Sequence, residues 1–160
     1  MTPLPARALA ALRWIVPLLR EEAVPFTITG GLAARLHGAT RPLADIDLNV
    51  PNEALARLAP RLREWTVSGP ARYADETWDL DLLTLRRDGQ DIDLSGAAYR
   101  LLDRATGRWL ELEADLNDWD AFPLEGLELP VEKKAALIAY KEKAAREVDL
   151  ADLRELRATA

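Results

Sequence analysis

Asp45 and Asp47 stand two residues apart in a segment that alternates carboxylate and aliphatic side chains. In a strand, both carboxylates project from one face, while Ile46 and Leu48 project from the other. Two carboxylates on one face repel each other unless a cation lies between them, and oxygen ligands of this kind suit magnesium or manganese better than zinc. The pair therefore predicts a divalent-metal site, with a solvated acidic pair neutralised by Arg41 as the alternative.

A glycine pair lies upstream of these carboxylates. Gly30 and Gly31 follow a β-prone run at residues 26–29 and precede a helical pattern at residues 32–36. Without side chains, their backbone can approach a phosphate closely, and the start of the helix has N–H groups to bind it. A strand-to-helix turn that needs left-handed backbone geometry explains the same pair equally well.

Asp93 supplies a third carboxylate. Two strand-like runs, residues 78–85 and 90–94, flank Asp88-Gly89, which is a strong hairpin signal. Asp93 lies on the second of these strands with an aliphatic residue on each side. It could bind a metal and accept the proton of an attacking hydroxyl as a general base. A charged residue on an exposed strand face is the alternative.

These motifs together resemble a known signature. The glycine pair, thirteen intervening residues, Asp-Ile-Asp-Leu at residues 45–48 and Ile-Asp-Leu at residues 92–94 are similar to the signature of the DNA polymerase β-like nucleotidyltransferases. The longer string over residues 30–48 resembles the small-molecule branch, which includes antibiotic nucleotidyltransferases and the nucleotidyltransferases of toxin–antitoxin systems. The resemblance covers residues 24–96 with specificity and residues 132–157 loosely.

The resemblance implies a reaction and a set of site residues. It implies transfer of a nucleoside monophosphate from ATP or another nucleoside triphosphate to a hydroxyl of a small molecule or a protein, with release of pyrophosphate. Two Mg²⁺ ions, for which Mn²⁺ can substitute, would be held by Asp45, Asp47 and Asp93. Nucleotide binding falls to Gly30, Gly31, Thr40, Arg41 and Lys141. Thr40 and Arg41 have neutralisation of the aspartate pair as an alternative role.

All lysines of the chain lie within residues 133–143, whereas positive charge elsewhere comes from arginine. Lys134 and Lys141 are seven residues apart and so share a helix face. A triphosphate needs cations opposite the metal-bound carboxylates, and the run from Lys141 to Asp152 resembles relatives in which a helical lysine reaches the phosphates. A solvated helix face with local ion pairs is the alternative.

Hydrophobic periodicity indicates an α/β or α+β fold, with a mixed β-sheet flanked by helices and further helices at the C-terminus. Strands are expected at residues 26–29, 45–50, 78–85, 90–94, 109–113 and 127–131. Helices are expected at residues 6–22, 32–36, 132–146 and 149–157, and from residue 52 over the stripe Leu55, Leu58 and Leu62. The length of 160 residues predicts one domain over residues 1–160.

The amino-acid composition argues against several classes of function. A formal charge of −6 argues against DNA binding through a basic face. The chain has no cysteine and one histidine, His37, which disfavours disulfides, zinc centres and a serine hydrolase. The apolar N-terminal stretch is interrupted by Arg7, Arg13 and Arg20, so we expect no membrane span and a cytoplasmic protein.

The charge balance favours a small or basic acceptor, drawn to a site rich in Asp79, Asp81, Asp91 and Asp93. The alternative is a catalytically inactive protein of the same fold that binds a nucleotide or a partner protein, for example as one component of a toxin–antitoxin pair. The chain is short for the resembled family, so a homodimer or a helical partner protein is expected to complete the site.

Overall fold

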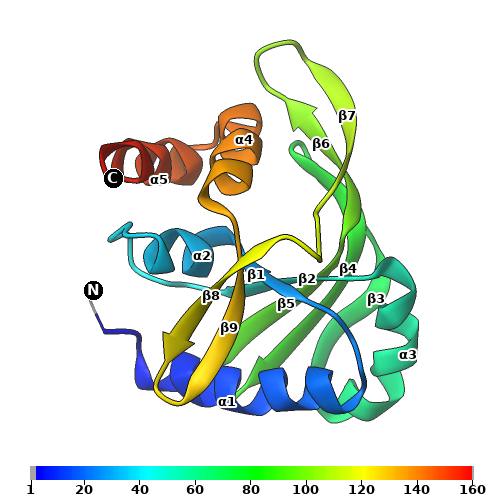
Figure 1. The fold of residues 1–160 in the computed structure, drawn as a ribbon. Helices are drawn as coiled ribbons and strands as arrows, with labels where there is room; N and C mark the ends of the chain where they lie inside the picture. Colours follow the sequence, from blue (N-terminus) through cyan, green and yellow to red (C-terminus); the bar gives the residue numbers. More distant parts are fainter. Residues whose placement is uncertain (1–2, 160) are drawn as a thin grey trace.

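The computed structural model describes residues 3–159, which form one mixed β-sheet flanked by helices (Figure 1). The helices are α1 (Ala6–Glu21), α2 (Gly30–Leu36), α3 (Asn52–Leu62), α4 (Lys134–Ala144) and α5 (Glu147–Ala158), with a 3₁₀ turn η1 (Arg63–Trp65). The strands are β1 (Thr27–Thr29), β2 (Ile46–Val50), β3 (Thr66–Ala74), β4 (Trp78–Arg87), β5 (Gln90–Gly96), β6 (Ala98–Asp103), β7 (Arg108–Glu113), β8 (Trp119–Leu124) and β9 (Leu127–Glu132). The expected fold class is confirmed.

The sheet joins segments that are distant in the sequence. Its order is β7-β6-β4-β5-β2-β1-β9-β8, and β3 pairs with β4 outside this order. Strand β2 is antiparallel to β1 and parallel to β5, and β1 is parallel to β9. The C-terminal strands and helices therefore meet the N-terminal half of the chain along β1.

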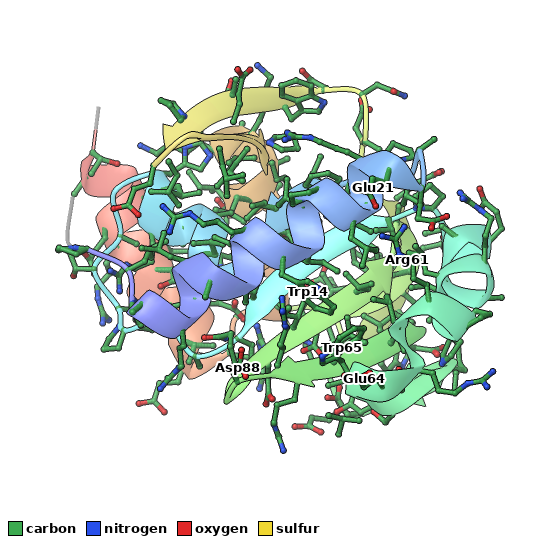
Figure 2. The ribbon with its side chains drawn as sticks, turned by 90° about the horizontal axis from the view of Figure 1, so that it is seen from below. Trp14, Glu21, Arg61, Glu64, Trp65 and Asp88 are labelled. Carbon is green, nitrogen blue, oxygen red and sulfur yellow. The ribbon has the colours of Figure 1, made fainter. Side chains whose placement is uncertain are left out.

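Helix α1 packs its apolar stripe against the sheet. Leu12, Ile15 and Leu19 recur at helical spacing and are fully buried. Figure 2 shows α1 lying across the strands, with Trp14 close to Trp65 of η1; the ring centroids of these two residues are 4.8 Å apart. This burial fixes one face of the sheet as core and leaves the other for polar residues.

The alternation of the central strands separates the two faces. Ile46 and Leu48 of β2 and Ile92 and Leu94 of β5 are fully buried, because they face the core on the side of α1 and α3. The predicted hairpin is present, with Asp88 and Gly89 both at positive φ between β4 and β5. The intervening carboxylates of β2 and β5 consequently project from the opposite face.

The C-terminal helices differ in their limits from the expectation. The helix predicted at residues 132–146 begins at Lys134, because Glu132 still pairs with Trp119 as the last residue of β9. It ends at Ala144, since Ala145 has left-handed backbone geometry. Helices α4 and α5 lie beside α2 in Figure 1.

Within residues 3–159, no helix combines the length and the apolar character needed to cross a membrane.

Candidate active site

Four polar side chains form a row across four adjacent strands. Asp93 of β5 is level with Asp47 of β2, and Asp47 is level with Thr29 of β1. Strand β9 pairs in parallel with β1, and Glu132 at its end accepts a hydrogen bond from the Thr29 hydroxyl. Because side chains at one level of a sheet share a face, Asp93, Asp47, Thr29 and Glu132 stand side by side; we call them the polar row.

A cavity of about 500 Å³ opens over the polar row. Its acidic lining residues are Asp45, Asp47, Asp75, Asp91, Asp93 and Glu132. Its aromatic lining residues are Tyr73, Trp78, Tyr99 and Tyr140. In the part of the chain that the structure describes, Arg146 is the one lysine or arginine in the lining. The cavity is thus strongly anionic and has aromatic walls.

The glycine turn packs directly against the aspartates. Gly30 has φ +62°, and a methyl group there would lie 2.4 Å from Oδ2 of Asp47, so no other residue fits without displacing that carboxylate. A methyl group at Gly31 would lie 3.1 Å from Nη2 of Arg41. Gly30 is therefore needed for the close approach of the turn to Asp47, whereas a methyl group at Gly31 would require only a small shift of the Arg41 guanidinium.

Burial and mutual repulsion raise the pKa values of the three predicted metal ligands. Burial, followed by the charges of Asp93 and Asp45, raises the pKa of Asp47 from 3.8 to about 7. Burial and then Asp91 raise the pKa of Asp45. Burial raises the pKa of Asp93, against a 2.7 Å hydrogen bond donated by the Thr84 hydroxyl. The cluster therefore carries more negative charge than its surroundings offset.

These carboxylates fit a hard divalent cation by their chemistry. They present oxygen donors alone, and a cation would relieve the repulsion that raises their pKa values. Among residues 3–159, however, no three carboxylate or imidazole groups are arranged as a formed metal centre. Metal binding by Asp45, Asp47 and Asp93 accordingly stays a prediction.

A buried ion-pair network connects the glycine turn with the C-terminal helices. Lys141 Nζ lies 3.0 Å from Asp152 and 3.4 Å from Asp149, and all three side chains are at most 1% exposed. Asp152 also binds Arg41 at 2.8 Å, and Asp149 binds Arg146 at 2.8 Å. Cations and carboxylates alternate along this network, which runs from Arg41 beside the glycine turn to Arg146 in the cavity lining.

The predicted site residues fall into two groups. The structure brings together, in the lining of one cavity, Gly30, Asp45, Asp47 and Asp93. It places outside that lining Gly31, Thr40, Arg41 and Lys141. The Thr40 hydroxyl donates to Glu155 of α5 at 2.8 Å, and Lys141 is held by the carboxylates of α5. His37, the C-cap of α2, contacts the carbonyl oxygen of Glu132 at 2.8 Å.

The acidic residues of β4 do not join the site, and the expectation for them is wrong. Asp79 forms ion pairs with Arg72 at 2.7 Å and Arg100 at 3.1 Å, and Asp81 accepts a 3.0 Å hydrogen bond from Asn52. The residue of β4 that stands level with Asp93 is Thr84. The alternation of β4 directs Trp78, Leu80 and Leu82 into the cavity and turns the two acids away from it.

Three charged lining residues were absent from the predicted site: Asp75, Glu132 and Arg146. Asp75 accepts the backbone N–H groups of Thr77 and Trp78, at 2.8 and 2.7 Å. Asp149, in the first turn of α5, accepts the backbone N–H of Arg146 at 3.1 Å and its Nε–H at 2.8 Å, and an acidic residue at the start of a helix is a signal that can be recognised in a sequence. Glu132 has no such local signal, because its position depends on the pairing of β9 with β1.

Solved structures share this fold. A putative nucleotidyltransferase from Thermotoga maritima, TM1012, is 23% identical with a TM-score of 0.76, over 99% of this chain and 97% of that chain. The lincosamide antibiotic adenylyltransferase LnuA, solved with lincomycin, is 15% identical with a TM-score of 0.63, over 98% and 99% of the two chains. ANT(2'')-Ia in complex with adenylyl-2''-tobramycin is 18% identical with a TM-score of 0.59, over 94% and 88%. The fold is that of the nucleotidyltransferases.

The family agrees with this class. The family model for aminoglycoside-2''-adenylyltransferase matches residues 11–156, and the chain belongs to that family. The chain is therefore a nucleotidyltransferase, related to antibiotic adenylyltransferases, and the resemblance drawn from its glycine and aspartate motifs is confirmed. Comparison with curated protein sequences gives no match.

Proposed function

We propose that the protein transfers a nucleoside monophosphate, with ATP as the first candidate donor, to a hydroxyl group of a small cationic acceptor. The observation that supports this most directly is the register of Asp47 with Asp93 on adjacent parallel strands, with Gly30 packed against Asp47. This arrangement gathers carboxylates and a side-chain-free turn at one cavity, which suits metal-assisted phosphoryl transfer.

The proposed reaction is an in-line displacement at the α-phosphorus. The acceptor oxygen forms a bond to this phosphorus, the bond to the oxygen bridging the α- and β-phosphates breaks, and pyrophosphate leaves. Asp93 takes the hydroxyl proton, and the hydrogen bond from Thr84 orients its carboxylate. Mg²⁺ bound by Asp45, Asp47 and Asp93 would stabilise the charge on the attacking and leaving oxygens.

The proposed nucleotide site lies at the glycine turn. Gly30 and Gly31 allow the phosphates to approach the backbone, and Arg41 beside Gly31 supplies a guanidinium group for them. Direct roles for Thr40, Arg41 and Lys141 require that their present carboxylate partners give way. Arg146 already lines the cavity, where its guanidinium is held by Asp149 at 2.8 Å.

The proposed acceptor is a hydroxylated molecule that carries amino groups. Six carboxylates face one arginine in the described lining of the cavity, so a cation is attracted there. Tyr73, Trp78 and Tyr99 offer faces on which a sugar ring can pack. The family name, and the tobramycin adduct in the ANT(2'')-Ia structure, are consistent with an acceptor of this class.

Isothermal titration with ATP in the presence of Mg²⁺ tests the nucleotide site. We expect the wild-type protein to bind and the doubly substituted Asp45→Asn/Asp47→Asn variant to lose the Mg²⁺-dependent part of the affinity. The matched control is Asp79→Asn, which removes a carboxylate outside the cavity. Equal binding by the wild type and the double variant would overturn the proposal.

Incubation with α-labelled triphosphates, Mg²⁺ and a panel of aminosugars and neutral sugars tests the acceptor. We expect label on an amine-bearing compound and release of pyrophosphate. Label on protein alone would contradict the small-molecule acceptor, and no label from any triphosphate would contradict catalysis.

A further inference from the structure

Glu132 holds α2 at both of its ends. At the start of the helix, the hydroxyl of Thr29 donates to the Glu132 carboxylate. At the end of the helix, Nε2 of His37 lies 2.8 Å from the Glu132 carbonyl oxygen and donates to it. One residue at the end of β9 thereby fixes the segment that contains the glycine turn and the helix that follows it.

The Thr29 hydroxyl uses its one O–H donor in the hydrogen bond to the Glu132 carboxylate. Thr29 occupies the N-cap position of α2, where a threonine side chain commonly accepts a hydrogen bond from the helix backbone. Here it makes no such cap and donates to Glu132 instead. The next residue is Gly30, which packs against Asp47. The direction of the Thr29 side chain is therefore linked to the position of the glycine turn.

The strand pairing at this point is short. Strand β1 has three residues, and its pairing with β9 is recorded at Ile28 and Val131 alone. Beyond that pair, the contacts of Glu132 with Thr29 and His37 extend the junction toward the cavity. Strand β9 leads directly into α4, which carries Lys141. Glu132 thus connects the glycine turn with the helices of the ion-pair network.

We propose that Glu132 is a positioning residue for nucleotide binding: through Thr29 and His37 it holds the glycine turn at a fixed place relative to Asp47 and to α4. This inference rests on the proposed function, because it concerns how the same site binds a triphosphate. Burial raises the pKa of Glu132, which is consistent with a carboxylate enclosed between elements of the fold. Glu132 has no assigned contact with the reacting atoms.

The test uses the full chain and removes each side of the contact. Thr29→Val keeps the shape of the side chain and removes the hydroxyl, Thr29→Ser keeps the hydroxyl, and Glu132→Gln removes the charge. Glu128→Gln makes the same change at an exposed position of β9 and serves as the matched control. The probe is MgATP, measured by equilibrium binding and by the KM for ATP alongside kcat, with thermal melting as the measure of stability.

We expect Thr29→Val and Glu132→Gln to weaken MgATP binding about tenfold, since a hydrogen bond to a charged group is lost or weakened. KM for ATP should rise while kcat and the KM for the acceptor change little. Thr29→Ser should restore binding, and the double variant should bind no more weakly than the weaker single variant, because the two residues act through one contact.

Other outcomes separate the two proposals. Suppose that the wild-type protein binds MgATP and transfers the nucleotide, and that Thr29→Val and Glu132→Gln bind MgATP equally well. The role proposed for Glu132 is then disproved, and the proposed function stands. A fall in melting temperature with unchanged Kd means that the contact is structural only, which also overturns the inference. If wild type binds no triphosphate, the proposed function fails, and the inference fails with it.

Discussion

Asp47 sits where its charge destabilises the protein in the absence of a cation. Burial, Asp93 and Asp45 raise its pKa from 3.8 to about 7, so the folded protein binds a proton more tightly than the unfolded chain does between these two values. The stabilising effect of that proton is complete below about pH 4 and is lost as the pH rises through about 7. Such strain is common where binding groups are gathered before their ligand arrives.

Asp47→Asn should therefore stabilise the protein in a chelator at about pH 8, by about 2 kcal/mol or roughly 5 °C in melting temperature. At about pH 5, where Asp47 is protonated in the folded wild type, the difference should shrink. Thermal melts over this pH range make the measurement. Asp79→Asn is the control, because the hydrogen bond from Arg72 lowers the pKa of Asp79, which lies outside the cavity, and its removal should give no gain. A lower melting temperature for Asp47→Asn at pH 8 would show that the carboxylate stabilises the fold.

Gly30 and Gly89 offer a matched comparison. Both have positive φ, +62° and +80°, but a side chain at Gly89 would meet nothing within 4 Å, whereas one at Gly30 would collide with Asp47. Gly89→Ala should cost about 1 kcal/mol and leave transfer intact. Gly30→Ala should cost more and reduce transfer at least roughly a hundredfold, because it moves the Asp47 carboxylate to which we assign metal binding in the proposed reaction. Urea unfolding and initial rates measure the two effects; equal rates in both variants would disprove the role of the turn.

The buried ion-pair network joins helix α4 to helix α5. From the sequence alone, the lysine-rich run favoured Lys141 as a phosphate ligand, whereas the structure surrounds Lys141 with Asp149 and Asp152. Removing one partner of a buried network leaves the others without compensation, which costs more than the network contributes in net terms. Lys141 therefore has a structural role that must be separated from any role in binding.

Lys141→Met should destabilise the protein by about 3 kcal/mol, the lower end for a broken buried pair, because Arg41 and Arg146 still neutralise the two carboxylates. Lys143→Met makes the same change at a side chain of α4 that is not buried and should stay within about 0.5 kcal/mol. Urea denaturation gives both values. If Lys141→Met keeps wild-type stability yet loses ATP affinity, its main role is at the phosphates.

Periodicity predicted some elements well and others not at all. Helices α1 and α3 and the β4–β5 hairpin follow from a buried apolar stripe or a turn pair. Strands β3, β6 and β8 were not predicted. For β3 the reason is physical: both of its faces are largely exposed and it contains Gly69 and Pro70, so no apolar alternation marks it.

The site residues also divide into those with a local sequence signal and those placed by contacts between distant segments of the chain. Gly30, Asp47 and Asp93 could be predicted because each carries a local signal, in a turn or an alternating strand. Glu132 could not, since it enters the polar row only when β9 pairs with β1. Arg146 reaches the cavity through the packing of the C-terminal helices against the sheet. Contacts between distant segments depend on topology, which one sequence does not determine by pattern alone.

The overall charge of −6 matches the sign of the cavity, where six carboxylates face one arginine of the described lining. A field of one sign steers oppositely charged ligands toward a site and opposes like-charged ones. The two proposed substrates have opposite charges, since the acceptor is cationic and MgATP is anionic. Their dependence on salt should therefore differ in direction.

Raising NaCl from about 0.02 to about 0.5 M should lower kcat/KM for the cationic acceptor roughly tenfold, because the screening length falls from about 20 Å or more to a few ångströms. Over the same range, kcat/KM for MgATP should stay level or rise.

Asp75→Asn removes one cavity charge while leaving an oxygen to accept the backbone N–H groups of Thr77 and Trp78, so it should flatten the acceptor's salt dependence. A neutral acceptor analogue serves as the control and should show little change. An acceptor rate independent of salt would mean that the carboxylates of the cavity serve the metal and nucleotide, and that the acceptor is selected by shape.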